Sequence, residues 1–192
     1  MKPTHPLPNP FTCILRGLAL LALWAAIGVM PASADEYSDV SQLMRSGKPA
    51  EALKKIDLHL ATRPRDPQMR FFKGLIQRDA GQTGEAIATF TALTEEYPEL
   101  PEPYNNLAVL FAAQNQFEKA RAALEMAIKA NPSYAVAYEN LGDVHARLAS
   151  HAYGRALQLD ARNASVPPKL ALVRELFGPV PKPLATGTIP AQ

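Results

Sequence analysis

The sequence predicts an all-α protein in which antiparallel helix pairs stack side by side, and two observations carry this prediction. Pro64, Pro98 and Pro132 recur at intervals of 34 residues, which is a typical length for one helix–turn–helix repeat unit. The stretches that precede these prolines have apolar residues at steps of three and four, the spacing of one helix face. Because a single helix pair cannot hide its apolar face, such units have to stack and share a core.

The composition agrees with a folded protein of this kind. A chain of 192 residues is the size of one ordinary domain, and 47% hydrophobic residues are too many for a wholly disordered chain. With 20 basic and 18 acidic residues, the charge is too balanced for a dedicated nucleic-acid binder, so we expect no nucleic-acid partner. The charges are nevertheless segregated, because residues 44–78 are mainly basic and residues 79–143 mainly acidic. Such asymmetry can orient a partner with the opposite pattern.

Residues 1–34 are predicted to be a secretory signal peptide. They contain Lys2 and Arg16 but no acid, then the apolar run 17–29, and they end in a small-residue site at Ala34. The run is shorter than the roughly 20 residues that span a bilayer, so cleavage near Ala34 should leave no stable membrane span. An uncleaved anchor is the alternative. This segment predicts a periplasmic or secreted protein.

Catalytic chemistry finds little support in the residues. Cys13 is the single cysteine and leaves with the signal peptide, and no phosphate-binding loop or catalytic motif occurs. Glu139, Asp143 and His145 could be imagined as a metal cluster, but steps of four and two do not share one helix face. His145 is instead expected to pack inside its unit. We therefore predict no enzyme, no metal site and no cofactor, with a metal-dependent hydrolase as the remaining enzyme alternative.

Small residues mark two further phases of the 34-residue period. Gly74, Ala108 and Gly142 are 34 residues apart, and we expect them to let the two helices of each unit approach closely. Gly47 and Gly81 share a second phase at the predicted turns, where glycine accepts a positive φ without a Cβ clash.

Together these residues resemble the tetratricopeptide repeat (TPR) family. The third unit matches the family pattern best, through Tyr104, Leu107, Ala108, Phe111, Ala120, Leu124, Ala127 and Pro132. The resemblance covers roughly residues 33–163 and implies a TPR solenoid over 35–163. Its units would lie at about 35–66, 67–100 and 101–134, with a shortened unit at 135–163.

The C-terminal part of the chain departs from the pattern. Gly142 and Ala149 are seven residues apart, whereas the matching pair in the second unit is twelve apart, so the turn is missing. We therefore predict one long helix from about Val136 to Asp160, with a tight hairpin as the alternative. Residues 165–177 are predicted to form a capping helix that covers the last core face. The proline-rich residues 178–192 are predicted to be a disordered tail.

In TPR proteins the first helix of each unit lines a concave groove that takes an extended peptide or a partner helix. Carried over unit by unit, the resemblance implies groove positions at Tyr37; Phe71, Leu75 and Arg78; Asn105, Val109 and Ala112; and Glu139, Asp143 and Arg147. This surface would be apolar in the middle, with one amide that can bond a ligand backbone, and acidic at the far end. It suits a segment with apolar anchors and a basic end.

Two alternatives remain open for these positions. Phe71 and Leu75 could pack against the neighbouring unit, and Glu139 with Asp143 could be an ordinary solvated helix face. Asn106 and Asn140 fit part of the family's clamp for C-terminal carboxylates, but the lysines of that clamp are absent.

The predicted function is that of an exported adaptor or scaffold, which binds a protein or peptide partner in the cell envelope through this groove. A self-associating structural protein, with a homo-oligomer as its working form, is the main alternative. The resemblance does not identify the partner.

Overall fold

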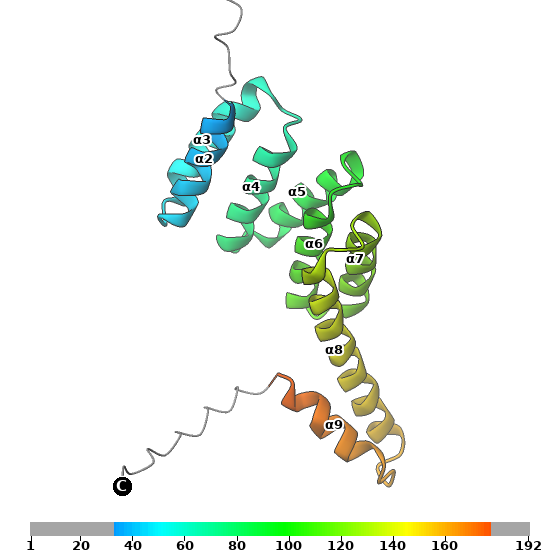
Figure 1. The fold of residues 1–192 in the computed structure, drawn as a ribbon. Helices are drawn as coiled ribbons and strands as arrows, with labels where there is room; N and C mark the ends of the chain where they lie inside the picture. The colour runs from blue at the N-terminus through cyan, green and yellow to red at the C-terminus, as the bar shows by residue number, and fades with distance from the viewer. Residues whose placement is uncertain (1–32, 178–192) are drawn as a thin grey trace, which may run out of the picture. The chain divides into compact units, whose positions relative to one another are not determined.

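The computed structural model describes residues 33–177, and within that range every regular element is a helix (Figure 1). The helices are α2 (Ser33–Arg45), α3 (Pro49–Thr62), α4 (Pro67–Asp79), α5 (Thr83–Glu96), α6 (Pro101–Ala113), α7 (Phe117–Ala130), α8 (Ala135–Leu159) and α9 (Val166–Glu175). The all-α prediction is confirmed. Most of the predicted signal peptide and the predicted tail, 178–192, lie outside the described residues. None of the described helices is long and apolar enough to cross a membrane.

The chain divides into two units, which we describe separately. The first ends at Lys55 and the second begins at Ile56, so that α3 contributes to both. In the first unit, Val40 of α2 and Ala52 of α3 are fully buried. Lys55 on α3 forms an ion pair with Asp39 on α2, which holds the two helices of this unit together at their exposed edge.

The second unit contains the hairpins α4/α5 and α6/α7 and then the longer α8. Helix α5 packs on α6, and α7 packs on α8, so neighbouring repeat units share their apolar faces. One cluster of buried residues lies between α5 and α6 around Phe90, Leu93 and Leu107. A second cluster lies between α6, α7 and α8 around Leu124 and Val144.

Three turns between paired helices have the same backbone geometry. Gly47, Gly81 and Asn115 are 34 residues apart and have φ values of 69°, 73° and 58°. In each turn the following N–H bonds a carbonyl five residues earlier; in the second turn Gln82 N donates to Gln77 O at 2.8 Å. This bond satisfies a carbonyl that the end of the helix leaves without a partner. The prediction for Gly47 and Gly81 is confirmed, and Asn115 is a third member that the glycine pattern did not reveal.

Helix α4 begins at a polar cap. Asp66 Oδ1 accepts a hydrogen bond from Met69 N at 2.9 Å, and Pro67 occupies the first turn, where no backbone N–H is needed. The other carboxylate oxygen of Asp66 lies 3.1 Å from Nε2 of the buried His59. The cap of α4 is thereby tied to the end of α3.

The predicted close approach at Gly74 is present. A Cβ atom at Gly74 would lie 2.7 Å from Cε1 of Phe90, a side chain that is fully buried on α5. The glycine lets α4 and α5 come together around this ring. Ala108 plays the equivalent part on α6, where it is 1% exposed.

The same expectation is wrong for Gly142. Residues 135–159 form one continuous helix, as predicted, so the shortened unit has no second helix. A Cβ atom at Gly142 would therefore meet nothing within 4 Å. His145, expected inside its unit, is exposed for the same reason. Its counterpart Gln77, 68 residues earlier, accepts a hydrogen bond from Thr89 on α5 instead.

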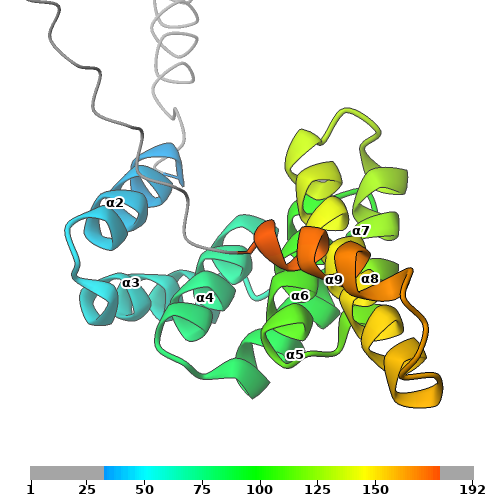
Figure 2. The ribbon, with the colours of Figure 1, turned by 90° about the horizontal axis from the view of Figure 1, so that it is seen from below.

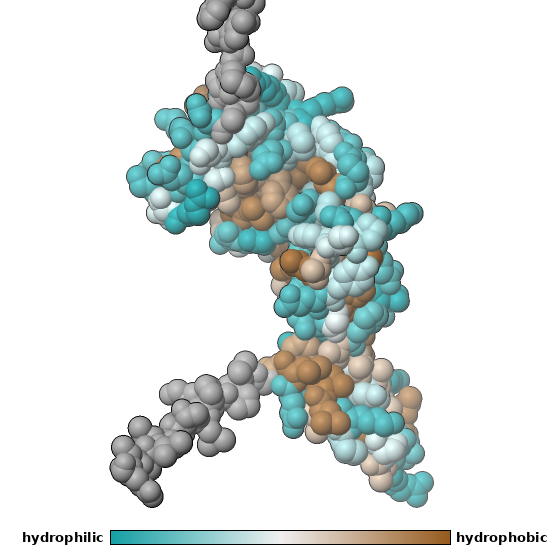
Figure 3. Space-filling model, viewed as in Figure 1, coloured by the Kyte–Doolittle hydropathy of each residue, from teal (hydrophilic) through white to brown (hydrophobic). Residues whose placement is uncertain are grey.

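Helix α9 folds back from the end of α8 and packs on it (Figures 1 and 2). Val166 and Leu170 are its buried residues. Leu172 and Leu176 stay 65% and 69% exposed, and apolar residues gather over α9 in Figure 3. The helix covers part of α8 while presenting an apolar face of its own.

Candidate functional site

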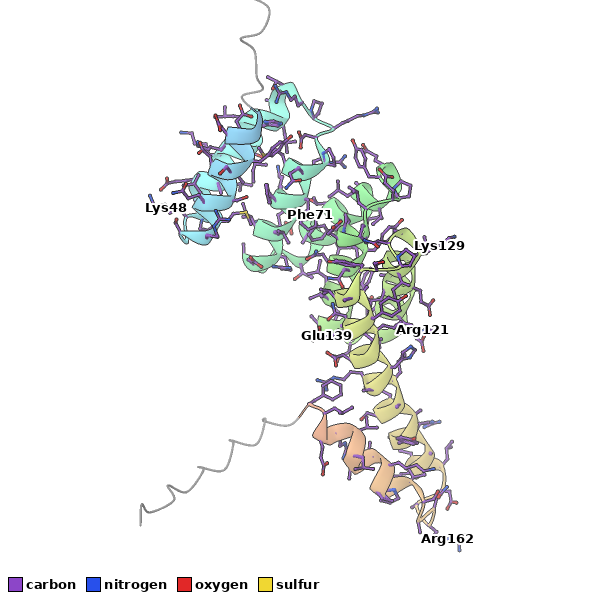
Figure 4. The ribbon with its side chains drawn as sticks, viewed as in Figure 1. Lys48, Phe71, Arg121, Lys129, Glu139 and Arg162 are labelled. Atoms are coloured by element: carbon purple, nitrogen blue, oxygen red, sulfur yellow. The ribbon has the colours of Figure 1, made fainter. Side chains whose placement is uncertain are left out.

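The candidate site is the surface formed by α4, α6 and α8, which we call the groove face. It carries seven of the eight predicted residues: Phe71, Leu75, Arg78, Asn105, Val109, Glu139 and Asp143. Figure 4 shows Phe71 on α4, and Glu139 on α8 on the side away from Arg121 and Lys129 of α7. Tyr37 lies half-buried on α2, in the first unit, and is therefore described apart from the others.

Phe71 and Leu75 are partly buried against the core between α4, α5 and α6. The Phe71 ring is tilted by 58° to the Phe90 ring, and the two centroids are 5.6 Å apart. Phe71 also lines a cavity of ≈ 290 Å³ with Pro67, Leu100 and Pro103, where the N-terminal ends of α4 and α6 lie together. We call this the first cavity. The side chain thus has both of the roles considered for it: one edge packs in the core and another faces an open apolar cavity.

Arg78 and Asn106 join α4 to α6. Arg78 Nη1 donates to Asn106 Oδ1 at 2.7 Å, and Arg78 Nη2 lies 2.8 Å from Asp79 Oδ1. Asn106 Nδ2 donates to the carbonyl of Glu102. Both sides of the Asn106 amide are occupied, so this residue positions helices rather than offering a ligand site.

Asn105 and Asn140 form the polar centre of the groove face. Asn140 Nδ2 on α8 donates to Asn105 Oδ1 on α6 at 2.7 Å. Among residues 33–177, no group bonds Asn105 Nδ2 or Asn140 Oδ1. An amide offers two donors and an acceptor, so the pair keeps a spare donor beside a spare acceptor whichever way both amides are turned. That combination matches the C=O and N–H of an extended backbone.

The acidic end of the groove face lies on α8. Glu139 and Asp143 are exposed, and among the described residues neither has an ion-pair partner. Asp143 and Arg147 line a second cavity of ≈ 350 Å³ with Ala112 on α6. Val109, between the two ends, is 41% exposed. The predicted succession of apolar, amide and acidic positions is therefore present on α4, α6 and α8.

One ionisable group beside this surface has a shifted pKa. Burial raises the pKa of Tyr134, in the connection before α8, and the nearby charge of Glu102 raises it further. Glu102 also lines the first cavity, so this end of the groove face is itself weakly acidic. No group of three or more His, Cys, Asp or Glu side chains in the described part of the chain could hold a metal ion.

Sequence reasoning missed several of the residues that shape this site. Pro67, Leu100 and Pro103 line the first cavity, although they carry no chemistry that a motif search detects. Asn140 was considered only for a carboxylate clamp, yet it completes the amide pair. Its signal was available: Asn140 lies one residue beyond the position 34 after Asn105, on the next groove helix.

The structure defines an all-α protein of stacked helix hairpins with a groove face on alternate helices. Two family models, each described as tetratricopeptide repeat, match residues 40–101 and 77–148, which together are more than half of the chain. The chain belongs to the tetratricopeptide-repeat family. Proteins with this fold are typically scaffolds for protein–protein interaction rather than enzymes.

Individual similar proteins are more distant. The chain is 33% identical over 76 residues to the Arabidopsis thaliana tetratricopeptide repeat domain-containing protein PYG7, chloroplastic; the match covers 37% of this chain and 25% of that relative. TTC0263, a thermophilic TPR protein of Thermus thermophilus, has a TM-score of 0.57 at 22% identity, covering 77% of this chain and 84% of that one. YrrB, a TPR protein with an unusual peptide-binding site, has a TM-score of 0.51 at 26% identity, and the match covers 57% of each chain. The chain thus spans well under two thirds of PYG7 and of YrrB.

Proposed function

We propose that this protein is an exported TPR adaptor that binds an extended segment of a partner protein across its groove face. The observation that carries the proposal is the Asn105–Asn140 pair, which keeps a donor and an acceptor next to each other on adjacent groove helices. A backbone bonded at both points would be fixed in direction and register. Each such hydrogen bond contributes about 1 kcal/mol, so the amide pair gives orientation more than affinity.

The two ends of the groove face supply the remaining selectivity. The first cavity, beside Phe71, is large enough for one apolar side chain of the partner. At the other end, Glu139 and Asp143 favour a basic residue, because both carboxylates face solvent without an ion-pair partner among the described residues. The ligand that this arrangement fits is an extended segment with an apolar anchor and a basic residue on opposite sides of a backbone contact. The peptide-binding site of the similar protein YrrB supports a peptide as the kind of ligand.

The test places a photo-crosslinking amino acid at Val109 or at Glu139 in the full chain in its native cell. A matched control is Met126 on α7, which is 40% exposed where Val109 is 41% exposed. We expect Val109 and Glu139 to capture one and the same protein, which Met126 does not capture. Asn105→Ala should weaken that protein's binding to the purified chain about tenfold, which corresponds to about 1.4 kcal/mol. Equal capture from Met126, or unchanged binding by Asn105→Ala, would contradict the groove assignment.

Export is part of the proposal and rests on residues 1–34 alone. Charged residues, a short apolar run and a small-residue exit support cleavage near Ala34 and a working location in the periplasm or outside the cell. N-terminal sequencing of the protein recovered from cells checks this, and we expect the mature chain to begin at Asp35. Retention of Met1 on the recovered protein would refute export by this route.

A further inference from the structure

The last described residue, Phe177, lies on the groove face. The guanidinium carbon of Arg147 is 3.7 Å from the centroid of the Phe177 ring, a cation–π contact with α8. Phe177 also lines the second cavity, together with Asp143 of α8 and Ala112 of α6. The chain therefore leaves the described part of the molecule from the acidic end of the groove face.

The direction of α9 produces this placement. Helix α9 runs back along α8 after the turn at residues 160–165, and its end lies toward the α6 side in Figure 2. Had α9 continued away from α8, residue 177 would leave the molecule far from Asp143. The fold instead delivers the following fifteen residues, 178–192, to the groove face.

The chemistry of residues 178–192 fits the groove face. The segment has no acidic side chain, one basic residue, Lys182, and the apolar residues Val180, Leu184 and Ile189. Lys182 is five residues beyond Phe177, within reach of Glu139 and Asp143, the two carboxylates without ion-pair partners among the described residues. The prolines at 179, 181 and 183 favour an extended backbone with little conformational entropy left to lose on binding.

The segment is also long enough. An extended proline-rich chain advances about 3.1 Å per residue, so fifteen residues reach roughly 46 Å. Packed helices lie about 8–10 Å apart, so the path from α8 across α6 to α4 is roughly 20 Å wide. Allowing for about two further helical turns along α8, Ile189 can reach the first cavity beside Phe71.

We propose that residues 178–192 dock in the groove of their own chain, with Lys182 at Glu139 and Asp143, the backbone on Asn105 and Asn140, and Ile189 in the first cavity. This inference rests on the proposed function, because it makes the tail a built-in competitor of the partner. A tethered segment has an effective concentration on the order of 1 mM. If its own affinity is on the order of 0.1 mM, it lowers partner binding about tenfold.

The tail's position can be measured in the mature chain, which has no cysteine of its own. A nitroxide on Ala185→Cys should broaden the backbone amide signals of Asn105, Val109 and Glu139 and spare Met126 and Lys129 on α7. Lys182→Glu should abolish this selective broadening, whereas the matched change Lys169→Glu, at an exposed lysine on α9, should leave it in place. Broadening that is absent, or equal on α7, would overturn the proposal.

Two further measurements separate the remaining outcomes. In a mixture of spin-labelled chains at natural isotope abundance with unlabelled ¹⁵N chains, groove signals of the ¹⁵N chains should stay sharp; their broadening would mean docking on a second copy and refute the intramolecular form. The double variant Lys182→Glu, Ile189→Asp should bind the captured partner about tenfold more tightly. If the spin label shows no docking while Val109 still captures a partner, the tail inference fails and the adaptor stands. If the tail docks but no partner is captured, the adaptor fails instead.

Discussion

The hairpins α4/α5 and α6/α7 differ from the α8/α9 region in one local feature, the turn. Each hairpin reverses at a residue with positive φ, Gly81 or Asn115. The equivalent position in the shortened unit is Ala149, which lies within the continuous helix α8. Without the turn there is no second helix, and the groups that would face it are left uncovered. Only Ala137 and Val144 are buried on the 25 residues of α8, whereas eight residues are buried on the 13 residues of α6.

Loss of one turn therefore exchanges buried core for a different arrangement of the chain. Helix α8 extends beyond α7 and supplies a platform for α9, which turns the chain back to the groove face. A fourth complete hairpin would cover the groups that α8 leaves exposed.

The largest contrast between the two regions should come from adding one methyl group at the same repeat position in each. Gly74→Ala places Cβ 2.7 Å from a buried carbon of Phe90, and overpacking of this kind destabilises by roughly 1–3 kcal/mol. Gly142→Ala meets nothing within 4 Å and should stabilise by up to about 1 kcal/mol, because alanine favours the helix. Urea unfolding of both variants measures the difference. A Gly74→Ala protein as stable as the parent would mean that the α4/α5 contact is looser than the structure has it.

Exchanging the turn residues tests the same contrast with a smaller effect. Gly81→Ala should destabilise by roughly 1–2 kcal/mol, since φ is 73° there. Ala149→Gly should also destabilise, by about 1 kcal/mol, because glycine weakens the interior of α8. The two substitutions are the reverse of each other at one repeat phase, yet both lower the free energy of unfolding. Asn115→Gly is the control and should be neutral or slightly stabilising. Stabilisation by Ala149→Gly would indicate a hairpin at residues 145–155.

The smallest expected effect concerns the connection between the two regions. Because the pKa of Tyr134 is raised, its contribution to stability is complete below pH 10, the ordinary value, and is lost as the pH rises through the folded-state pKa. Tyr134→Phe should therefore remove part of the alkaline loss of stability and leave the neutral-pH dependence unchanged. Thermal unfolding from pH 8 to pH 11 checks this. An identical alkaline profile in parent and variant would assign the loss to other groups.

Much of the fold could be predicted because a repeat states the same physical requirement several times. Three prolines and two glycines at one period were enough to place the helices, their turns and the close approach at Gly74. The gap between Gly142 and Ala149 predicted the single long helix, and α8 confirms it. Asn115 was missed because asparagine reaches the left-handed region less often than glycine, although its position in the repeat was a sufficient signal.

The site was less predictable than the fold. Spacing placed Asn105 and Arg78 on the groove helices, but it could not say that Arg78 bonds Asn106 while Asn105 bonds Asn140. Those pairings join different repeat units and depend on distances across the helix stack. Gly142 and His145 show the converse error, since both were assigned roles that require a partner helix the shortened unit does not contain.

The order of residues was sufficient to define a helical TPR array, because periodic apolar and small residues act through local geometry and nearest-neighbour stacking. Packing in three dimensions was needed to establish which polar groups keep a spare donor or acceptor, where the two cavities lie, and where the chain leaves the groove face at Phe177. These properties depend on how helices far apart in the sequence pack against each other, and no spacing within one repeat encodes that packing.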